Sequence, residues 1–440
     1  MSKISVRWLF LILVLLSRER LAVVVTSPMM PEKQQFVCAP GIHRATGRAQ
    51  ADGAIEGLRD LGIFDYIVGV TYDTTPSNSS PAVGTVALLE EEIGQMLVKL
   101  ACRHHIYDLF GKNLRNVVVG RKTSGPGHPI FLKLAKEWPS LVDVIDYDSL
   151  VTLDMAPWVG TFVERVVNLV KVWCISTFAN VTFDRGSYKD LLLSIMKYLD
   201  VQTNPPIPFK FRAPKPVSNA RFGEPAQYYL DLALLSGQLP WLTPAQREEV
   251  KTMAFICAVF YGPGFLKSAV GIDAAYNDLT SILHYRQLRP FMPRVAAEAL
   301  ATFNRHLDYI TPQNIVLALV CDKFSVEQRE RLARALLSLL PNRVRALPPS
   351  RVSYPGPNFT LSDTFWPEDN TLPDISQFVT GESFLIFNIL KTTDEDLTQF
   401  LSSSVDTWDA DPDSPNFCSG FAQLRGFGLN THFVNDPAER

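Results

Sequence analysis

Short apolar runs of strand length alternate with amphipathic stretches over the first 135 residues, and this alternation constrains the fold more than any other feature of the sequence. The strand-length runs cover residues 5–16, 21–26, 35–39, 67–73 and 97–102. Helical spacing of apolar residues occurs at 47–61, at 83–93 and from 104 to 110. Three strands followed by helix, strand, helix and strand predict a mixed α/β sheet that is layered by helices.

The pattern changes after this region, because apolar residues then recur every three or four positions. Strand signals are scarce over residues 157–345, so the spacing predicts an all-helical region with a Pro-rich linker at 204–216. A second Pro-rich stretch at 341–373 precedes a helical segment at 378–401, and the acidic tail from Asp406 onward predicts a loop. We expect three parts: an α/β core at 1–135, a helical region at 136–345 and a C-terminal part at 346–440.

The balance of charges gives the molecule as a whole no attraction for nucleic acid. The 440 residues include 42 Lys and Arg against 45 Asp and Glu, a formal net charge of −3. Any contact with DNA must therefore come from a local basic patch. Six cysteines are scattered without a C-x-x-C pair, which favours free thiols in a reducing compartment over a disulfide scaffold.

The apolar run from Trp8 to Leu16 has two interpretations. Lys3 and Arg7 precede it, as basic residues precede the apolar part of a secretory signal. The run lacks a small-residue cleavage site, however, and is too short to span a bilayer. We expect a buried strand, and therefore a nuclear or cytoplasmic protein that does not enter a membrane. A secreted binding protein with a signal peptide is the alternative.

Asp73 stands where an apolar strand ends and a polar turn begins. A carboxylate at a strand end suits a metal ligand, because the sheet holds it rigidly while the loop leaves it open to solvent. The same position suits a residue that only forms the turn. Composition and periodicity alone leave both roles open for Asp73.

Two motifs give this strand end a wider context. Residues 73–78 read D-T-T-P-S-N, and residues 100–106 read L-A-C-R-H-H-I. This pairing resembles a group of transposon-encoded proteins. The C-x-x-H formed by Cys102 and His105 is similar to a motif of the hAT superfamily of DNA transposases. Four further stretches fit the same group, at residues 47–58, 123–131, 220–222 and 435–440.

The resemblance implies an RNase H-like α/β fold, with a mixed sheet, a large all-α insertion and a helical C-terminal region. In such transposases three carboxylates hold two Mg²⁺ or Mn²⁺ ions, which assist the displacement at phosphorus. The first acid lies on the first strand, the second at the end of the fourth strand, and the third on a helix after the insertion. Asp73 corresponds to the second acid, and so to a metal ligand, and Glu439 corresponds to the third.

The chain departs from this pattern at the first and third positions. Leu9 stands where the group has its first aspartate, and no Asp precedes Asp52. Glu439 is the penultimate residue and has no following helix to hold it, so its role is vestigial. We therefore expect that strand cleavage has been lost. An active metal-dependent nuclease is the alternative, and it would need Glu19 or Glu32 as a replacement first acid.

Basic and aromatic residues indicate where DNA would bind. Ala220, Arg221 and Phe222 stand where the related proteins usually have A-R-W. The Trp of that motif is similar to the aromatic that hAT enzymes use near flipped DNA ends. Phe222 offers a ring for base stacking. Arg121 and Lys122 belong to a second basic cluster that could contact phosphate. Solvated loop charges and a core aromatic are the structural alternatives.

The cysteine and histidine of the second motif have a structural interpretation as well. A structural zinc site needs four ligands, and no second pair accompanies Cys102 and His105. We expect these two residues to support the fold beside the active site. The resulting hypothesis is a transposase-derived protein with an inactive core, which keeps weak, non-specific DNA binding or protein binding and can form homo-oligomers.

Overall fold

The computed structural model describes residues 9–16, 20–26, 34–120, 127–183, 185–215, 223–349, 361, 365–369, 371–410, 414, 417–431 and 433–434. The chain divides into two compact units. Unit 1 comprises Met1–Ile106, Ser268–Thr280 and His306–Arg440, and unit 2 comprises Tyr107–Lys267 and Ser281–Arg305. The predicted boundaries at 135 and 345 do not coincide with these units. The reason is that the chain returns to unit 1 twice, and periodicity along a sequence carries no information about such returns.

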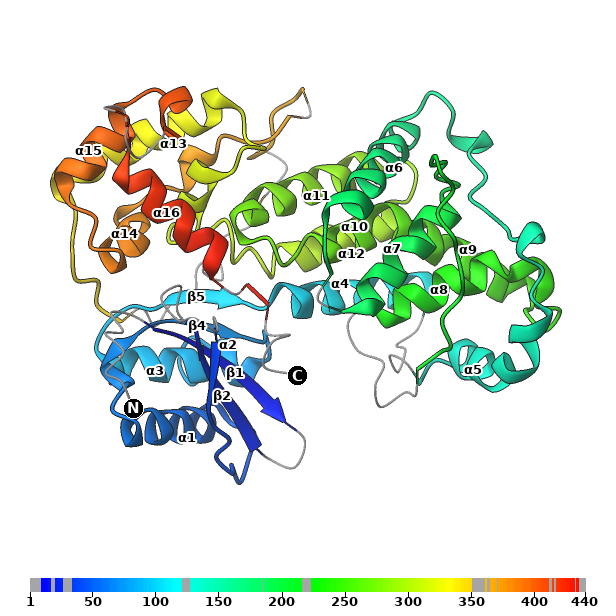
Figure 1. Ribbon diagram of the computed structural model, residues 1–440, viewed down its shortest axis with the longest axis horizontal. Coiled ribbons are helices and arrows are strands. Elements are labelled where there is room, and N and C mark those ends of the chain that lie inside the picture. Colours follow the sequence, from blue (N-terminus) through cyan, green and yellow to red (C-terminus); the bar gives the residue numbers. More distant parts are fainter. Residues whose placement is uncertain are drawn as a thin grey trace. The chain divides into compact units, whose positions relative to one another are not determined.

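A five-stranded mixed sheet lies in unit 1, in the order β3-β2-β1-β4-β5 (Figure 1). Its strands are β1 (Leu9–Leu16), β2 (Arg20–Thr26), β3 (Gln34–Cys38), β4 (Ile67–Tyr72) and β5 (Val98–Ala101). The pairs β1–β2 and β2–β3 are antiparallel, whereas β1–β4 and β4–β5 are parallel. The predicted mixed α/β sheet is therefore confirmed.

The N-terminal apolar run forms the central strand of this sheet. β1 lies between β2 and β4, and its side chains from Leu9 to Leu13 are at most 2% exposed. A strand that is buried on both faces needs apolar residues at consecutive positions, which explains the uninterrupted run. The strand interpretation is confirmed, and the compartment in which the protein works stays a prediction.

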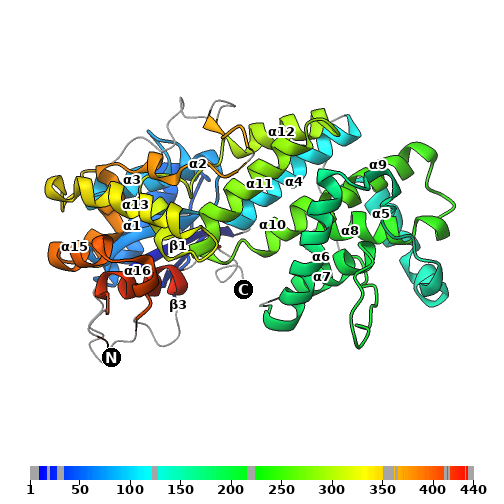
Figure 2. The ribbon, with the colours of Figure 1, turned by 90° about the horizontal axis from the view of Figure 1, so that it is seen from above.

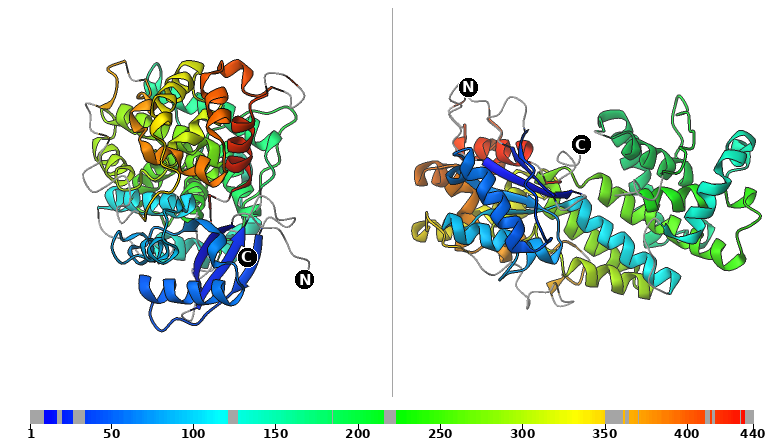
Figure 3. Two further views of the ribbon diagram at one scale, coloured as in Figure 1. Left: turned by 90° about the vertical axis from the view of Figure 1, so that its left-hand side faces the viewer. Right: turned by 90° about the horizontal axis from the view of Figure 1, so that it is seen from below.

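Helices lie on both sides of the strands. α1 (Gly47–Asp60) buries Ala51, Ile55 and Leu58 and contacts β2, β3 and α3 (Thr85–Ile93). α16 (Ser419–Asn430) reaches β1 through Phe427, whose ring centroid lies 5.4 Å from that of Phe10. α1 and α16 lie on opposite sides of the sheet (Figures 1 and 3).

The outer edge of β5 is covered by other segments of unit 1. The amide Nδ2 of Asn314 donates to the carbonyl oxygen of Lys99 at 3.0 Å, and the hydroxyl of Tyr309 donates to the carbonyl of Ala101. Just before the strand, the backbone N–H of Met96 donates to the carbonyl of Leu347 at 3.0 Å. Edge groups that are satisfied in this way are not free to pair with another chain.

The regular elements of unit 2 are all helices over its described residues, as the spacing predicts. Its helices are α4 (Arg103–Val119), α5 (Pro129–Leu141), α6 (Phe162–Asn180), α7 (Gly186–Tyr198), α8 (Glu224–Leu234), α9 (Pro244–Ile256), α10 (Gly262–Leu266), α11 (Ala274–Leu288) and α12 (Pro293–Phe303), with the first residues of α4 and α11 in unit 1. α4, α11 and α12 lie side by side (Figure 2). Phe110 joins them, because its ring centroid lies 5.2 Å from that of Tyr285 and 4.9 Å from that of Phe303.

The C-terminal part of the chain belongs to unit 1 and contains α13 (Val326–Leu339), α14 (Leu385–Ile389), α15 (Asp394–Ser402) and α16. α14 and α15 confirm the helical segment predicted at 378–401. The loop predicted after Asp406 is wrong over α16, where Phe421, Leu424 and Phe427 are buried. Three glycines within α16 weaken its helical signal, and packing overrides that weak propensity. None of the helices described is long and apolar enough to cross a bilayer.

Candidate functional site

Asp73 directly follows β4 and is half-buried at the carboxyl end of the sheet. Its Oδ1 accepts a hydrogen bond from the backbone N–H of Thr75 at 2.9 Å and another from Nδ2 of Asn78 at 3.0 Å. Thr75 is the N-terminal cap residue of α2 (Pro76–Ser79). Asp73 therefore forms an Asx turn that joins the strand to this short helix. The turn-forming role, left open by the sequence, is confirmed.

The pairing of β1 with β4 shows that Leu9, the predicted position of the first acid, does not lie beside Asp73. β1 pairs with β4 through Leu9 and Ile67 at one end and through Ile12 and Thr71 at the other. Continuing this register by two residues on each strand places Val14 beside Asp73. Leu9 then lies roughly 17 Å from that level along β1. Leu9 is thus at the wrong end of β1 to share an ion with Asp73. Motif spacing carries no information about strand register, so it could not reveal this.

The described residues do not fit a two-metal centre. β1 has the sequence LFLILVLL and therefore offers no carboxylate at any position, whichever residue stands beside Asp73. In the ranges that the structure describes, no three His, Cys, Asp or Glu side chains are grouped as metal ligands. Glu19, Glu32 and Glu439 lie outside the described residues. A single Asp with one oxygen engaged in a turn falls short of the near-octahedral oxygen shell that Mg²⁺ requires.

Cys102 and His105 follow β5 at the same end of the sheet. The backbone N–H of Cys102 donates to the carbonyl oxygen of Tyr72 at 2.7 Å, which extends the pairing of β4 and β5 by one residue. Cys102 is fully buried and His105 is half-buried. These contacts agree with the structural role that we predict for Cys102, and they place His105 in the first turn of α4.

Arg103 forms a buried ion pair at this end of the sheet, and the sequence did not single it out. Its guanidinium makes two hydrogen bonds to the carboxylate of Asp278, at 2.7 and 3.0 Å, and its side chain is 1% exposed. The guanidinium carbon also lies 4.8 Å from the centre of the Tyr309 ring. The backbone N–H of Arg103 donates to the carbonyl of Phe433 at 3.2 Å. This buried charge ties the motif to two later segments of unit 1.

A second carboxyl group near these residues titrates close to neutral pH. Burial, together with the charge of the neighbouring Asp278, raises the pKa of Asp308 to about 7. The pKa of the Tyr72 hydroxyl is also raised, mainly by burial and then by the charge of Asp308. Asp308 precedes Tyr309 and lies more than 200 residues after the ends of β4 and β5, so sequence spacing offers no signal for it.

The candidate DNA-binding residues Arg121, Lys122, Arg221 and Phe222 lie outside the described residues. The basic stretch before Arg221 is partly described. There Arg212 and Lys215 both contact the buried carboxylate of Glu224, at 2.6 and 2.5 Å. Two cations that could have contacted phosphate are thus engaged within unit 2.

Comparisons of the chain with protein-family models, with curated proteins and with solved structures found no match. The comparisons thus assign the chain to no family.

Proposed function

We propose that this chain derives from a transposase, has an RNase H-like arrangement of strands and no longer cuts DNA. The resemblance implies one acid on the first strand and another at the end of the fourth. In support, β1 and β4 are adjacent and parallel, and Asp73 directly follows β4. The proposal about ancestry rests on these positions together with the two motifs, because the comparisons assign no family.

The observation that carries the proposed loss of cleavage is the pairing of an apolar β1 with a turn-forming Asp73. Two-metal catalysis needs a set of carboxylates that holds two ions about 4 Å apart at the reacting phosphate. β1 supplies only aliphatic and aromatic side chains on its side. On the other side, Oδ1 of Asp73 is already shared by two donors.

What the protein retains, on this proposal, is binding. Arg121, Lys122, Arg221 and Phe222 are the residues that we assign to DNA. Because the chain carries a net charge of −3 and Glu224 engages two neighbouring cations, we expect weak and non-specific binding. Its dissociation constant should be on the order of 10⁻⁵ M and should rise steeply with salt.

The test is cleavage of a labelled DNA duplex in Mg²⁺ and in Mn²⁺ by the wild-type chain, Asp73→Ala and Asp73→Asn. We expect no cleavage above buffer for any of the three. A mobility-shift titration in EDTA at two salt concentrations measures binding separately from chemistry. It should show the same weak affinity for unrelated sequences.

The two Asp73 variants separate a catalytic role from a structural one. Asn keeps the oxygen that accepts both turn hydrogen bonds but removes the charge, whereas Ala removes both. Wild-type cleavage that is lost in Asp73→Asn would overturn the proposal, because a charge-dependent role would then be present. Glu19→Gln and Glu32→Gln would next identify the replacement acid.

A further inference from the structure

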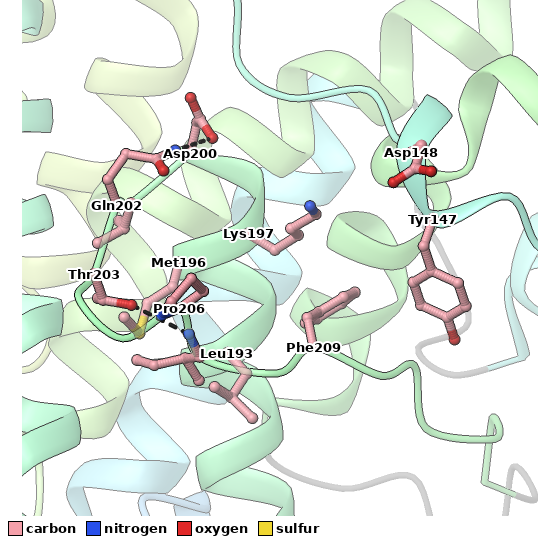
Figure 4. Close-up of a pocket in the computed structure, with 12 residues that line it drawn as sticks. Tyr147, Asp148, Leu193, Met196, Lys197, Asp200, Gln202, Thr203, Pro206 and Phe209 are labelled. Atoms are coloured by element: carbon pink, nitrogen blue, oxygen red, sulfur yellow. Dashed lines mark hydrogen bonds between the residues drawn. The ribbon is translucent and has the colours of Figure 1, made fainter.

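A pocket of about 330 Å³ lies in unit 2 beside the C-terminal turn of α7 (Figure 4). Three segments line it: α7 with Met196 and Lys197, the loop that follows α7 as far as Phe209, and the turn at Tyr147 and Asp148. This volume lies at the small end of the range of ligand-binding pockets, about 300–1,000 Å³.

The end of α7 shapes one wall of the pocket. The backbone N–H of Val201 donates to the carbonyl of Met196 at 2.9 Å, and that of Asp200 donates to the carbonyl of Lys197 at 3.2 Å. Asp200 has a φ of 52°, the left-handed conformation that this helix ending requires and that glycine usually supplies.

Two aromatic side chains, Tyr147 and Phe209, also line the pocket. The ring centroid of Phe211 lies 4.9 Å from that of Phe209 and 5.7 Å from that of Tyr147. Phe211 is buried and is itself in edge contact with Trp138 at 6.4 Å. Phe209 and Tyr147 are therefore held by a packed aromatic cluster, and both are half-buried and line the pocket.

Two charged side chains at the pocket remain available to a ligand. In Figure 4 the amino group of Lys197 points into the space between α7 and the turn at Tyr147 and Asp148. Among the described residues neither Lys197 nor the carboxylate of Asp148 has an ion pair or a side-chain hydrogen bond. Asp200 differs, because its carboxylate accepts a hydrogen bond from Nε2 of Gln202 at 2.7 Å and turns away from the pocket.

We propose that this pocket binds a small aromatic carboxylate, with its ring against Phe209 and Tyr147 and its carboxylate on Lys197. A half-buried ammonium without an internal partner gains a charge-assisted hydrogen bond when an anion arrives. The two rings offer apolar and offset-stacking surface to a flat ligand. The pocket belongs to unit 2, and the inference does not depend on whether the chain derives from a transposase.

Asp148 narrows the class of ligand further. Its carboxylate at the rim repels a second negative charge, so a singly charged carboxylate is favoured over a doubly charged phosphate. The same carboxylate accepts a hydrogen bond from an amino group on the ring. The favoured ligand is therefore an aromatic carboxylate that also carries a donor, and 2-aminobenzoate is the simplest probe of that kind.

A lysine in the last turn of a helix also has a structural use, because it stabilises the negative end of the helix dipole. That role would change stability but would leave binding of an added anion untouched. Binding measurements therefore separate the two roles.

The experiment titrates 2-aminobenzoate into the full chain by calorimetry, with saturation-transfer NMR to observe the bound ligand. One molecule should bind per chain, with a dissociation constant on the order of 1 mM or lower for a ligand of this size. Lys197→Met, which keeps the apolar stem, should weaken binding roughly tenfold. Binding of aniline, which lacks the carboxylate, should be weak and unchanged by this variant.

Lys189→Met on the same helix is the matched control, because the Lys189 ammonium lies over the ring of Phe178 and does not line the pocket. It should bind the probe like the wild type, and phenyl phosphate should bind more weakly than 2-aminobenzoate. Thermal unfolding checks that each variant is folded. Absence of saturable binding to the wild type, or equal binding by Lys197→Met, would overturn the proposal.

Discussion

The carboxyl end of the sheet and the pocket beside α7 differ in what their charged groups contact. At the sheet end, Arg103 is paired with Asp278 and Asp73 is engaged by its own turn. At the pocket, Lys197 and Asp148 face open space (Figure 4). The recognisable motifs lie at the first site, whereas no motif marks the second. A sequence signature can thus mark residues that hold the fold together, while charges available to a ligand lie elsewhere.

The cost of burying charge explains the difference. A charge that is removed from water must be paired, so Arg103 at 1% exposure comes with a bidentate carboxylate. The side chain of Lys197 is half-buried, so its ammonium keeps part of its hydration and can remain unpaired until a ligand arrives. The two sites should therefore respond in opposite ways to substitution, with losses of stability at the first and losses of binding at the second.

The largest expected effect is that of Arg103→Met. It leaves Asp278 buried without its partner, which should lower the free energy of unfolding by up to about 5 kcal/mol. The loss should shrink in acid, where Asp278 takes up a proton. Urea unfolding at pH 7 and pH 5 measures both. Arg48→Met is the control, because its ion pair with Asp52 is exposed and should contribute less than about 1 kcal/mol. Equal losses for the two variants would contradict the proposed difference.

Asp231 on α8 is a buried acid that accepts side-chain hydrogen bonds from neutral groups. Its Oδ1 accepts hydrogen bonds from Gln227 at 2.8 Å and Ser194 at 3.2 Å, and burial raises its pKa to about 7. The folded state then keeps a proton that the unfolded chain loses near pH 4. The retained proton stabilises the folded state fully below about pH 4, and this contribution to the free energy of unfolding is lost as the pH rises to about 7.

Asp231→Asn should remove this pH dependence, since Asn keeps the accepting oxygen and is neutral at every pH. At pH 8 the variant should be more stable than the wild type by up to about 4 kcal/mol. At pH 4.5 the two should differ little. Unfolding free energies at both pH values provide the measurement, and parallel pH profiles would show that Asp231 does not carry the dependence.

Substitution of Asp73 should change the free energy of unfolding less than substitution of Arg103 or Asp231. Asp73→Ala removes the acceptor for Thr75 and Asn78, so it should cost about 1 kcal/mol of unfolding free energy. Asp73→Asn keeps the acceptor and should cost less than half of that. A stable Asp73→Ala protein would show that the turn does not need this side chain, and would reopen a role in binding or chemistry.

The smallest effect is expected at the rim of the pocket. Asp200→Gly relieves the left-handed backbone at φ 52° and should raise the free energy of unfolding by roughly 0.5–1 kcal/mol. Chemical denaturation of the wild type and the variant measures this difference.

Local order along the chain was predictable, because it depends on near neighbours. The run from Leu9 to Leu16, the helix at 47–60 and the strand that ends before Asp73 follow from apolar period and turn residues. The helical part beyond residue 157 follows from the same spacing. α16 was missed, since its glycines hide a helix that only packing against Phe10 and its other neighbours stabilises.

The sites depended on tertiary structure, because their residues meet across long stretches of chain. Arg103 and Asp278 are 175 positions apart, and the register of β1 against β4 alone shows that Leu9 lies far from the level of Asp73. The pocket likewise unites Tyr147, Lys197 and Phe209 from three segments. The sequence by itself determined the strands, most of the helices and the end of the strand before Asp73. Packing decided which charges are paired and which remain open to a ligand, because the cost of an unpaired charge depends on burial.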